Sequence, residues 1–458
     1  MGKGHTNTYT SGYITSEVQI IICARSLLFC SKIFTEKMQS LDSKAYKLAL
    51  GVPVHASTLK TYAEISVLPF QEQMKLASAK YILRSNTIQN SNTPELNLKS
   101  EVHFPKRAKS INSLTTINTY TSDLFQQSGI NPKYVAPRIS FSTIPEWEQK
   151  CVQFDIDYLD VSKSESPIFY ASVRSHINEQ YPNHLKVYTD GSVLDNKAAG
   201  AGFVIPSLKV EKSYYIGKGF SIFTAELVAI LMSLNYLLNF PFTLIQLLIC
   251  VDSKSVLKSL QSFNMRVRGE LVTEITHVIH FLSTQGTSVN FCWVPSHCGF
   301  PANEWADRTA KKGAQSKNNA IKIEIPLSLH EGYCLLEKAC WNKLDLLLQN
   351  CCYPRKKIKC KACSSTDRHN DRVFSSLIYR LRLDALKTKF SRNVSCVCGD
   401  QISPLHILFY CDSMKRFLPN WLTDVEITQE SIANVLSNNL QMLEIVQGLV
   451  KSPVGRFL

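Results

Sequence analysis

The sequence predicts an α/β domain with a mixed five-stranded sheet flanked by helices, between a helical N-terminal region and a C-terminal helical region that contains cysteine and histidine. Three apolar segments joined by short turns come first, at residues 185–189, 199–205 and 211–218. Apolar segments that alternate with helical patterns follow them. Strands joined by short turns pair antiparallel, whereas strands separated by a helix pair parallel, so the sheet is expected to be mixed.

The period of the apolar residues places the remaining elements. We expect strands and helices in the order strand 244–251, helix 253–262, helix 269–284, strand 288–294 and helix 302–313, after a first helix at 224–239. The run 227–251 has no charged residue and is long enough to suggest a membrane span. Pro241 divides it into a part with helical period and a part typical of a buried strand, so we expect protein core and no membrane.

Composition limits the class of protein. The chain has 458 residues, which suggests about two to four folded units. Its 45% hydrophobic content excludes a mostly disordered protein, and the net charge of +14 favours nucleic acid or another anionic surface as a partner. The 15 cysteines come without a recognisable secretory leader, so we expect reduced or metal-bound thiols and an intracellular protein.

Changes in composition divide the chain into five parts. Residues 1–20 are read as a polar, disordered leader, 21–84 as a helical region, 85–182 as a linker rich in Ser, Thr, Asn and Pro, 183–316 as the α/β domain and 317–458 as a basic, Cys/His-containing region.

Four carboxylates occupy ends of predicted elements. Asp190 ends the first strand and Asp252 the fourth, so parallel pairing of these strands would place them side by side. Glu226 lies in the first turn of a helix, just after Thr224, a candidate N-cap, and Asp307 lies one turn into the last helix. Carboxylates this close repel one another unless cations share the site, and Mg²⁺ prefers such oxygen ligands.

Four motifs, VYTDGS, TAELVAI, LLICVDSKSVL and WVPSHCGFPANEWADRTAKKGA, resemble in order and spacing those of a type 1 ribonuclease H domain. The resemblance implies hydrolysis of the RNA strand of an RNA–DNA hybrid, which leaves a 5′-phosphate and a 3′-hydroxyl. It also implies that the four carboxylates bind two Mg²⁺ ions, for which Mn²⁺ can substitute. His297 matches a histidine that aids proton transfer or product departure.

The resemblance further implies contacts with nucleic acid. Gly191 and Ser192 stand where the family contacts RNA through backbone near the DGS turn, and Asn303 and Glu304 where it shapes the loop of the last helix and touches RNA. Contacts with the 2′-hydroxyl separate RNA from DNA at the cleaved strand.

The chain departs from many cellular ribonucleases H at two places. Ile222 and Phe223 stand where those enzymes carry polar residues that grip the hybrid, and only NMRVRGE, with Arg266 and Arg268, remains of a long basic segment. Both features resemble ribonuclease H domains of non-long-terminal-repeat retrotransposons. Fewer cations imply fewer neutralised phosphates and weaker hybrid binding by the isolated domain.

The C-terminal region offers a candidate zinc site. Cys396, Cys398, His406 and Cys411 can form a tetrahedral Zn²⁺ site, although they can also be reduced cysteines around an amphipathic helix. RLRLDALKTKF, CVCG and HILFYC resemble the zinc-knuckle-like segment that follows ribonuclease H in retrotransposon polyproteins.

A basic cluster just upstream is a candidate phosphate-binding stripe, although a charge run can also be a solvated surface. It contains Arg355, Lys356, Lys357, Lys359 and Lys361. Cys360 and Cys363 form a Cys-x-x-Cys pair that overlaps the end of this cluster. The pair has no obvious second pair, so we assign it no metal.

The N-terminal helices resemble the segment after the polymerase in the same polyproteins, without a polymerase core. Three hypotheses follow: a Mg²⁺-dependent hybrid nuclease, a nucleic-acid-binding retroelement remnant without catalysis, and a relative of the same fold that acts on DNA. The DGS turn and the PSHCG…NEWAD ending argue against the third.

Overall fold

A computed structural model describes the protein at residues 32–87, 117–137, 152–157, 167–195, 197–239, 246–262, 267–297, 299–315, 320–349, 372–386 and 395–455. The chain forms two compact units, each made of segments that are far apart in sequence. The first, here called the sheet unit, contains Lys80–Ser100 and Gly129–Leu335. The second, the helical unit, contains Met1–Ala79, Glu101–Ser128 and Leu336–Leu458.

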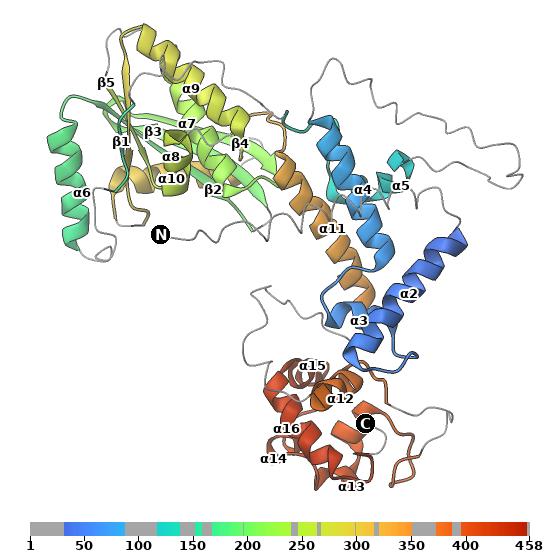
Figure 1. Cartoon of the computed structure of the whole chain (residues 1–458). Coiled ribbons are helices and arrows are strands. Elements are labelled where there is room, and N and C mark those ends of the chain that lie inside the picture. The colour runs from blue at the N-terminus through green and yellow to red at the C-terminus, as the bar shows by residue number, and fades with distance from the viewer. Residues whose placement is uncertain are drawn as a thin grey trace, which may run out of the picture. The chain divides into compact units, whose positions relative to one another are not determined.

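The sheet unit is built on a mixed seven-stranded sheet with the order β1-β6-β5-β2-β3-β4-β7 (Figure 1). The strands are β1 (Phe154–Asp155), β2 (Leu185–Val193), β3 (Ala198–Ile205), β4 (Val210–Lys218), β5 (Gln246–Val251), β6 (Ser288–Trp293) and β7 (Ile321–Lys322). Strands β2, β3 and β4 pair antiparallel, and β2, β5 and β6 pair parallel. The five predicted strands are confirmed. The two edge strands β1 and β7 were not predicted, because two residues have no period to detect.

Successive side chains of the central strands point to opposite faces of the sheet and pack into two hydrophobic cores, one on each face. Val187 of β2 belongs to the core beneath helices α7, α8 and α9, whereas its neighbour Tyr188 belongs to the core beneath α6 and α10. The helices are α6 (Pro167–Gln180), α7 (Ile222–Leu238), α8 (Lys254–Gln261), α9 (Gly269–Thr284) and α10 (Pro301–Gln315), with a 3₁₀ turn η3 (Pro206–Leu208).

The packed unit begins before residue 183, where the sequence predicted the domain to begin. Strand β1 pairs with β6, and Asp155 of β1 accepts a hydrogen bond from Tyr181 at 2.7 Å. Val173 and Ile177 of α6 are 1% and 2% exposed, because their i, i+4 spacing turns both onto the sheet. Part of the expected linker 85–182 is therefore folded onto the domain.

The uncharged run 227–251 contains the end of a helix and a strand, as predicted. Helix α7 ends at Leu238, β5 begins at Gln246, and Pro241 lies outside the described residues. Among the helices that the structure describes, none has the length and apolarity needed to cross a membrane.

The helical unit combines both ends of the described chain. Its helices are α2 (Lys32–Leu50), α3 (Thr58–Glu64), α5 (Ile117–Ser128), α12 (Arg372–Arg382), α13 (Asp412–Lys415), α14 (Asn420–Thr423), α15 (Gln429–Ser437) and α16 (Asn439–Val450), with a π-helical turn η5 (His406–Tyr410). Helices α4 (Phe70–Asn86) and α11 (Leu329–Gln349) contribute residues to both units. Arg382 of α12 forms a buried ion pair with Glu64 of α3 at 3.0 Å. The predicted leader 1–20 lies outside the described residues.

Candidate active site and metal sites

Two acidic side chains lie where the parallel pairing of β2 with β5 ends. The first strand was predicted to end at residue 189, but β2 continues to Val193, so Asp190 lies within the strand. Thr189 of β2 is the register partner of Val251 of β5, and Asp190 and Asp252 each follow by one residue. The two aspartates therefore lie side by side, as the predicted parallel pairing requires.

Helix α7 contributes the third carboxylate. Ser221 is its N-cap, and the Ser221 Oγ accepts a hydrogen bond from the Thr224 N–H at 3.2 Å. The predicted cap at Thr224 is wrong, because Ser221 already satisfies the free N–H groups one turn earlier. Glu226 consequently lies in the second turn of α7.

Close backbone packing places Glu226 against β2. A Cβ atom on Gly191 would lie 2.4 Å from the backbone nitrogen of Glu226, so only glycine allows this approach. The Gly191 N–H also donates a hydrogen bond to the Glu226 carboxylate. Gly191 and Ser192, the predicted RNA contacts, are both buried, and Ser192 is 7% exposed.

The three carboxylates form a buried cluster. One oxygen from each of Asp190, Glu226 and Asp252 lies within 4.8 Å of the others. Burial, followed by repulsion from Asp252 and Asp307, raises the pKa of Asp190 to about 8. Burial and the same repulsion from Asp252 hold the pKa of Glu226 well above its ordinary value. The cluster is therefore unfavourable in its charged form unless a cation neutralises it.

The donor set fits Mg²⁺. Asp190 Oδ2 and Glu226 Oε2 are buried and have no hydrogen-bond partner among the described residues. Buried carboxylate oxygens normally find a partner, so a ligand for these two atoms is to be expected. Several carboxylate oxygens with no sulfur or nitrogen suit a hard divalent cation.

Helix α10 adds a second group beside the first. His297, Glu304 and Asp307 each place one ligand atom within 4.8 Å of the others. His297 is exposed, in a left-handed conformation (φ 53°) on the loop after β6. Lys311, one turn after Asp307, donates to Asp307 Oδ2 at 2.7 Å. Sequence reasoning missed the grouping of Glu304 with Asp307 and the Lys311 pair, although i, i+3 and i, i+4 spacings indicate both.

Asn303 lies inside the site. It is 3% exposed, and its side-chain amide donates a hydrogen bond to Asp252. This hydrogen bond lowers the pKa of Asp252, but burial outweighs it and the pKa remains raised. Asn303 thus orients a carboxylate in this structure, whereas the sequence predicted an RNA contact.

Comparison with known proteins agrees with this geometry. The family model described as RNase H matches residues 182–315. The chain is also 30% identical over 147 residues to a ribonuclease H from Polaromonas naphthalenivorans (strain CJ2), a match that covers 29% of this chain and 89% of that protein. The chain belongs to the ribonuclease H family. Its ribonuclease H domain is an enzyme of the class that acts on RNA–DNA hybrids, and the matched residues include every carboxylate of the site.

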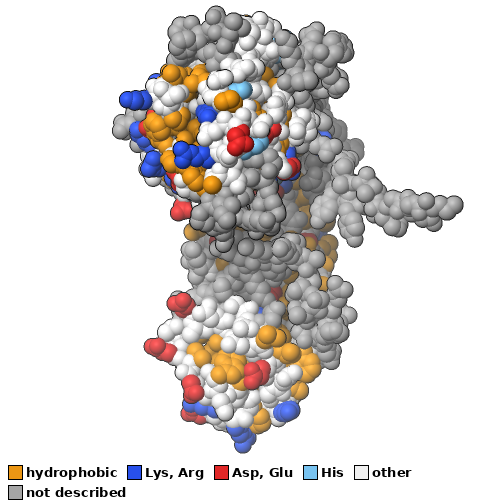
Figure 2. Space-filling model, turned by 90° about the vertical axis from the view of Figure 1, so that its left-hand side faces the viewer, with side chains coloured by type: hydrophobic (Ala, Val, Ile, Leu, Met, Phe, Trp, Pro, Cys, Tyr) orange, Lys and Arg blue, Asp and Glu red, His pale blue; other side chains and the backbone are white. Residues whose placement is uncertain are grey.

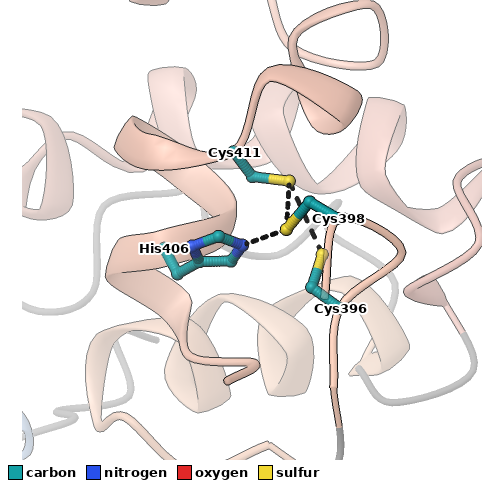
Figure 3. Close-up of side chains that lie close together, drawn as sticks. All are labelled: Cys396, Cys398, His406 and Cys411. Carbon is teal, nitrogen blue, oxygen red and sulfur yellow. Dashed lines mark hydrogen bonds between the residues drawn. The ribbon is translucent and has the colours of Figure 1, made fainter. Parts of the chain in front are cut away.

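A separate cluster lies in the helical unit, outside the ribonuclease H domain (Figure 3). Its four side chains, Cys396, Cys398, His406 and Cys411, offer ligand atoms that all lie within 4.8 Å of one another. Two come from the tight turn around Gly399. Of the other two, His406 is the first residue of the π-helical turn η5 and Cys411 follows its last residue. The structure therefore brings the four predicted residues together, and their use as ligands stays a prediction.

The distances in this cluster suit a tetrahedral Zn²⁺ site. The Sγ atom of Cys411 lies 3.5 Å from that of Cys396 and 3.7 Å from that of Cys398. Zn–S bonds of about 2.3 Å give S···S edges of about 3.8 Å in a tetrahedron. Asp400 Oδ2 lies 3.8 Å from His406 Nδ1, where a carboxylate can orient the imidazole of a zinc ligand.

The predicted basic cluster with Arg355, Lys356 and Lys357 lies outside the described residues, as does Arg266. Arg268 is described, and its side chain is 1% exposed in ion pairs with Glu270 and Glu331. Arg268 is therefore buried in the sheet unit, which contradicts its prediction as a remnant of a phosphate-binding segment.

Proposed function

We propose that this ribonuclease H domain hydrolyses the RNA strand of RNA–DNA hybrids with two Mg²⁺ ions. The proposed ligands are Asp190, Glu226, Asp252 and Asp307. The observation that carries the proposal is the convergence of three of these carboxylates, from β2, α7 and the end of β5, within 4.8 Å. Mn²⁺ is expected to replace Mg²⁺, because it accepts the same oxygen ligands.

The residues around the proposed metal site have different roles in the reaction. The ions, when bound, activate water and neutralise the charge that develops on the phosphate and the leaving oxygen. Asp190 and Glu226 supply buried oxygens without other partners, and the Asn303 amide fixes the orientation of Asp252. His297 lies on an exposed loop, from which its imidazole can deliver a proton to the departing 3′-oxygen or aid product departure.

Recognition of RNA is proposed to use backbone near Gly191 and Ser192, together with Glu304 on α10. Figure 2 shows acidic and histidine side chains gathered on one face of the sheet unit, with lysine and arginine side chains near them. Such a surface can hold metal at its centre and phosphates around it. Ile222, at the start of α7, is 52% exposed and offers the hybrid no charge or hydrogen bond.

We also propose that the chain is the C-terminal part of a non-long-terminal-repeat retrotransposon polyprotein. The apolar start of α7 and the Cys/His cluster after the ribonuclease H domain support this origin. On this proposal, residues 21–84 follow the polymerase, 183–316 carry the nuclease and 317–458 form the nucleic-acid-binding end.

A second candidate function is nucleic-acid binding without catalysis. The observation that favours it is the Cys/His cluster, whose geometry suits Zn²⁺ independently of the carboxylates. Zinc would then stabilise a small binding module in the helical unit.

Cleavage of a labelled RNA–DNA hybrid in Mg²⁺ by the full chain tests the first function. The informative variant is Asp252→Asn, and Asp195→Asn, in an exposed turn after β2, is the matched control. We expect cleavage of the RNA strand alone by the wild type and the control, with loss in Asp252→Asn and with chelator. If the wild type binds the hybrid but cleaves neither strand in Mg²⁺ or Mn²⁺, the second function remains.

A further inference from the structure

Glu331, at the start of α11, binds the first turn of α7 although it lies outside the family-matched residues 182–315. Its Oε1 accepts hydrogen bonds from the Ser221 N–H at 2.8 Å, the Ser221 Oγ at 2.8 Å and the Thr224 Oγ1 at 2.6 Å. Glu331 is 4% exposed and Thr224 is fully buried, so water does not compete for these bonds.

The second oxygen of Glu331 is held as firmly as the first. Its Oε2 accepts hydrogen bonds from the Ser328 N–H at 3.0 Å and the Ser328 Oγ at 2.9 Å. Arg268 Nη1 lies 3.5 Å from the same oxygen and donates to the Pro326 carbonyl at 2.8 Å. Burial alone would raise the pKa of Glu331, but Arg268 and these donors outweigh it and keep the pKa below its ordinary value.

Helix α7 transmits this contact to the metal site. Ser221 and Thr224 belong to its cap and first turn, and Glu226 follows two residues after Thr224. Because the backbone at Glu226 packs directly against Gly191, a small shift of α7 changes the distance between the Glu226 and Asp190 carboxylates. A buried anion at the helix N-terminus favours one position of the helix.

We propose that Glu331 is a positioning residue of the ribonuclease H site: it fixes the first turn of α7 and thereby the Glu226 carboxylate in the geometry that binds metal. The inference rests on the proposed metal site. It means that the segment after the family-matched domain forms part of the working enzyme.

The test compares Glu331→Gln in the full chain with Glu324→Gln, an exposed glutamate seven residues earlier. The glutamine keeps the shape of the side chain but removes its charge and presents an N–H₂ group to the donors around it. Binding of Mn²⁺ is measured from the electron paramagnetic resonance signal of the free ion, beside the melting temperature and the kcat and KM for the hybrid.

We expect Glu331→Gln to weaken Mn²⁺ binding about tenfold and to lower kcat with little change in KM, while Glu324→Gln matches the wild type. Unchanged Mn²⁺ affinity in folded Glu331→Gln would overturn the inference, as would faster cleavage, which would mean that the carboxylate obstructs the site. If Glu331→Gln fails to fold, Thr224→Val removes the hydrogen bond from Thr224 Oγ1 to Glu331 instead. Unchanged Mn²⁺ affinity in Thr224→Val would also overturn the inference.

The Mn²⁺ measurement separates this inference from the proposed function. A wild type that binds Mn²⁺ without cleaving hybrid contradicts the proposed function and still allows the Glu331 comparison. A wild type that binds no Mn²⁺ contradicts both.

Discussion

Asp190 is held where ionisation is costly without a cation. It is 5% exposed, and its strongest electrostatic neighbours are the acids Asp252 and Asp307. A residue chosen for stability alone would be neutral at this buried position of β2. The cost is understandable if the site is arranged for a bound metal rather than for the metal-free fold.

Asp190→Asn is therefore expected to abolish cleavage while stabilising the metal-free protein. The pKa of Asp190 is raised from 3.8 to about 8, so the folded state binds more protons than the unfolded state and loses stability as pH rises between these values. Asparagine removes that loss, and the gain in the free energy of unfolding is on the order of 5 kcal/mol near pH 8 and on the order of 2 kcal/mol near pH 5.

Thermal unfolding with chelator, at several pH values, measures this gain. Asp195→Asn is again the control, because its carboxylate is exposed. A variant that is less stable than the wild type at pH 8 would contradict the argument.

The sequence predicted that Asp190 and Asp252 lie close together because a carboxylate after a buried apolar segment is unusual in itself. It placed Asp190 at a strand end, whereas β2 continues past it to Val193. It could not predict the partners of those acids that come from distant segments. Glu331 and Thr224 lie 107 positions apart, and neither has a local pattern that indicates the other. Asn303 was expected to touch RNA, because the sequence does not show that its amide turns inward to Asp252.

At the scale of elements, a tight turn and a π-helical turn bring the Cys/His cluster together. Cys396 and Cys398 come from the turn at Gly399 (φ 98°), whereas His406 begins η5 and Cys411 directly follows it. The wide π-helical turn is uncommon, and such turns are often found at functional sites. The sequence predicted these four residues from their types and spacing, whereas it missed strands too short to have a period.

Cys398→Ser is expected to release one Zn²⁺ per chain and to destabilise the residues around the cluster, since a structural zinc contributes directly to folding. Zinc content measured by mass spectrometry and hydrogen exchange of residues 395–411 test this. Cys334→Ser, an exposed thiol on α11, is the matched control. Equal zinc content in both variants would rule out the site.

At the scale of the whole molecule, the ribonuclease H domain lies within a chain whose two ends build one unit. Arg382 pairs with Glu64 at 3.0 Å, both side chains are 2% exposed, and Arg380 donates to the Gly51 carbonyl. The sequence predicted both helical regions but not that they form one unit, because helical periodicity shows which face of a helix is buried and not against what.

Glu64→Gln leaves Arg382 buried without its counter-charge and is expected to destabilise the helical unit by about 3–5 kcal/mol. Faster amide hydrogen exchange in α12 measures this loss of stability. Asp412→Asn breaks the ion pair with Lys415 at 2.6 Å, where Asp412 is 88% exposed, and no measurable change is expected. Similar effects of both changes would contradict the view that burial decides how much an ion pair contributes to stability.

The pairing of Glu64 with Arg382 also bears on how the protein is made. The two residues lie 318 positions apart. A ribosome that adds about 5–20 residues per second produces Arg382 roughly 15–60 s after Glu64. During that interval the nascent α3 has no Arg382 to pair with, and synthesis of the intervening nuclease domain is finished before Arg382 is added. We therefore expect the nuclease domain to fold first on the ribosome, with the early helices dependent on chaperones until the last helices emerge.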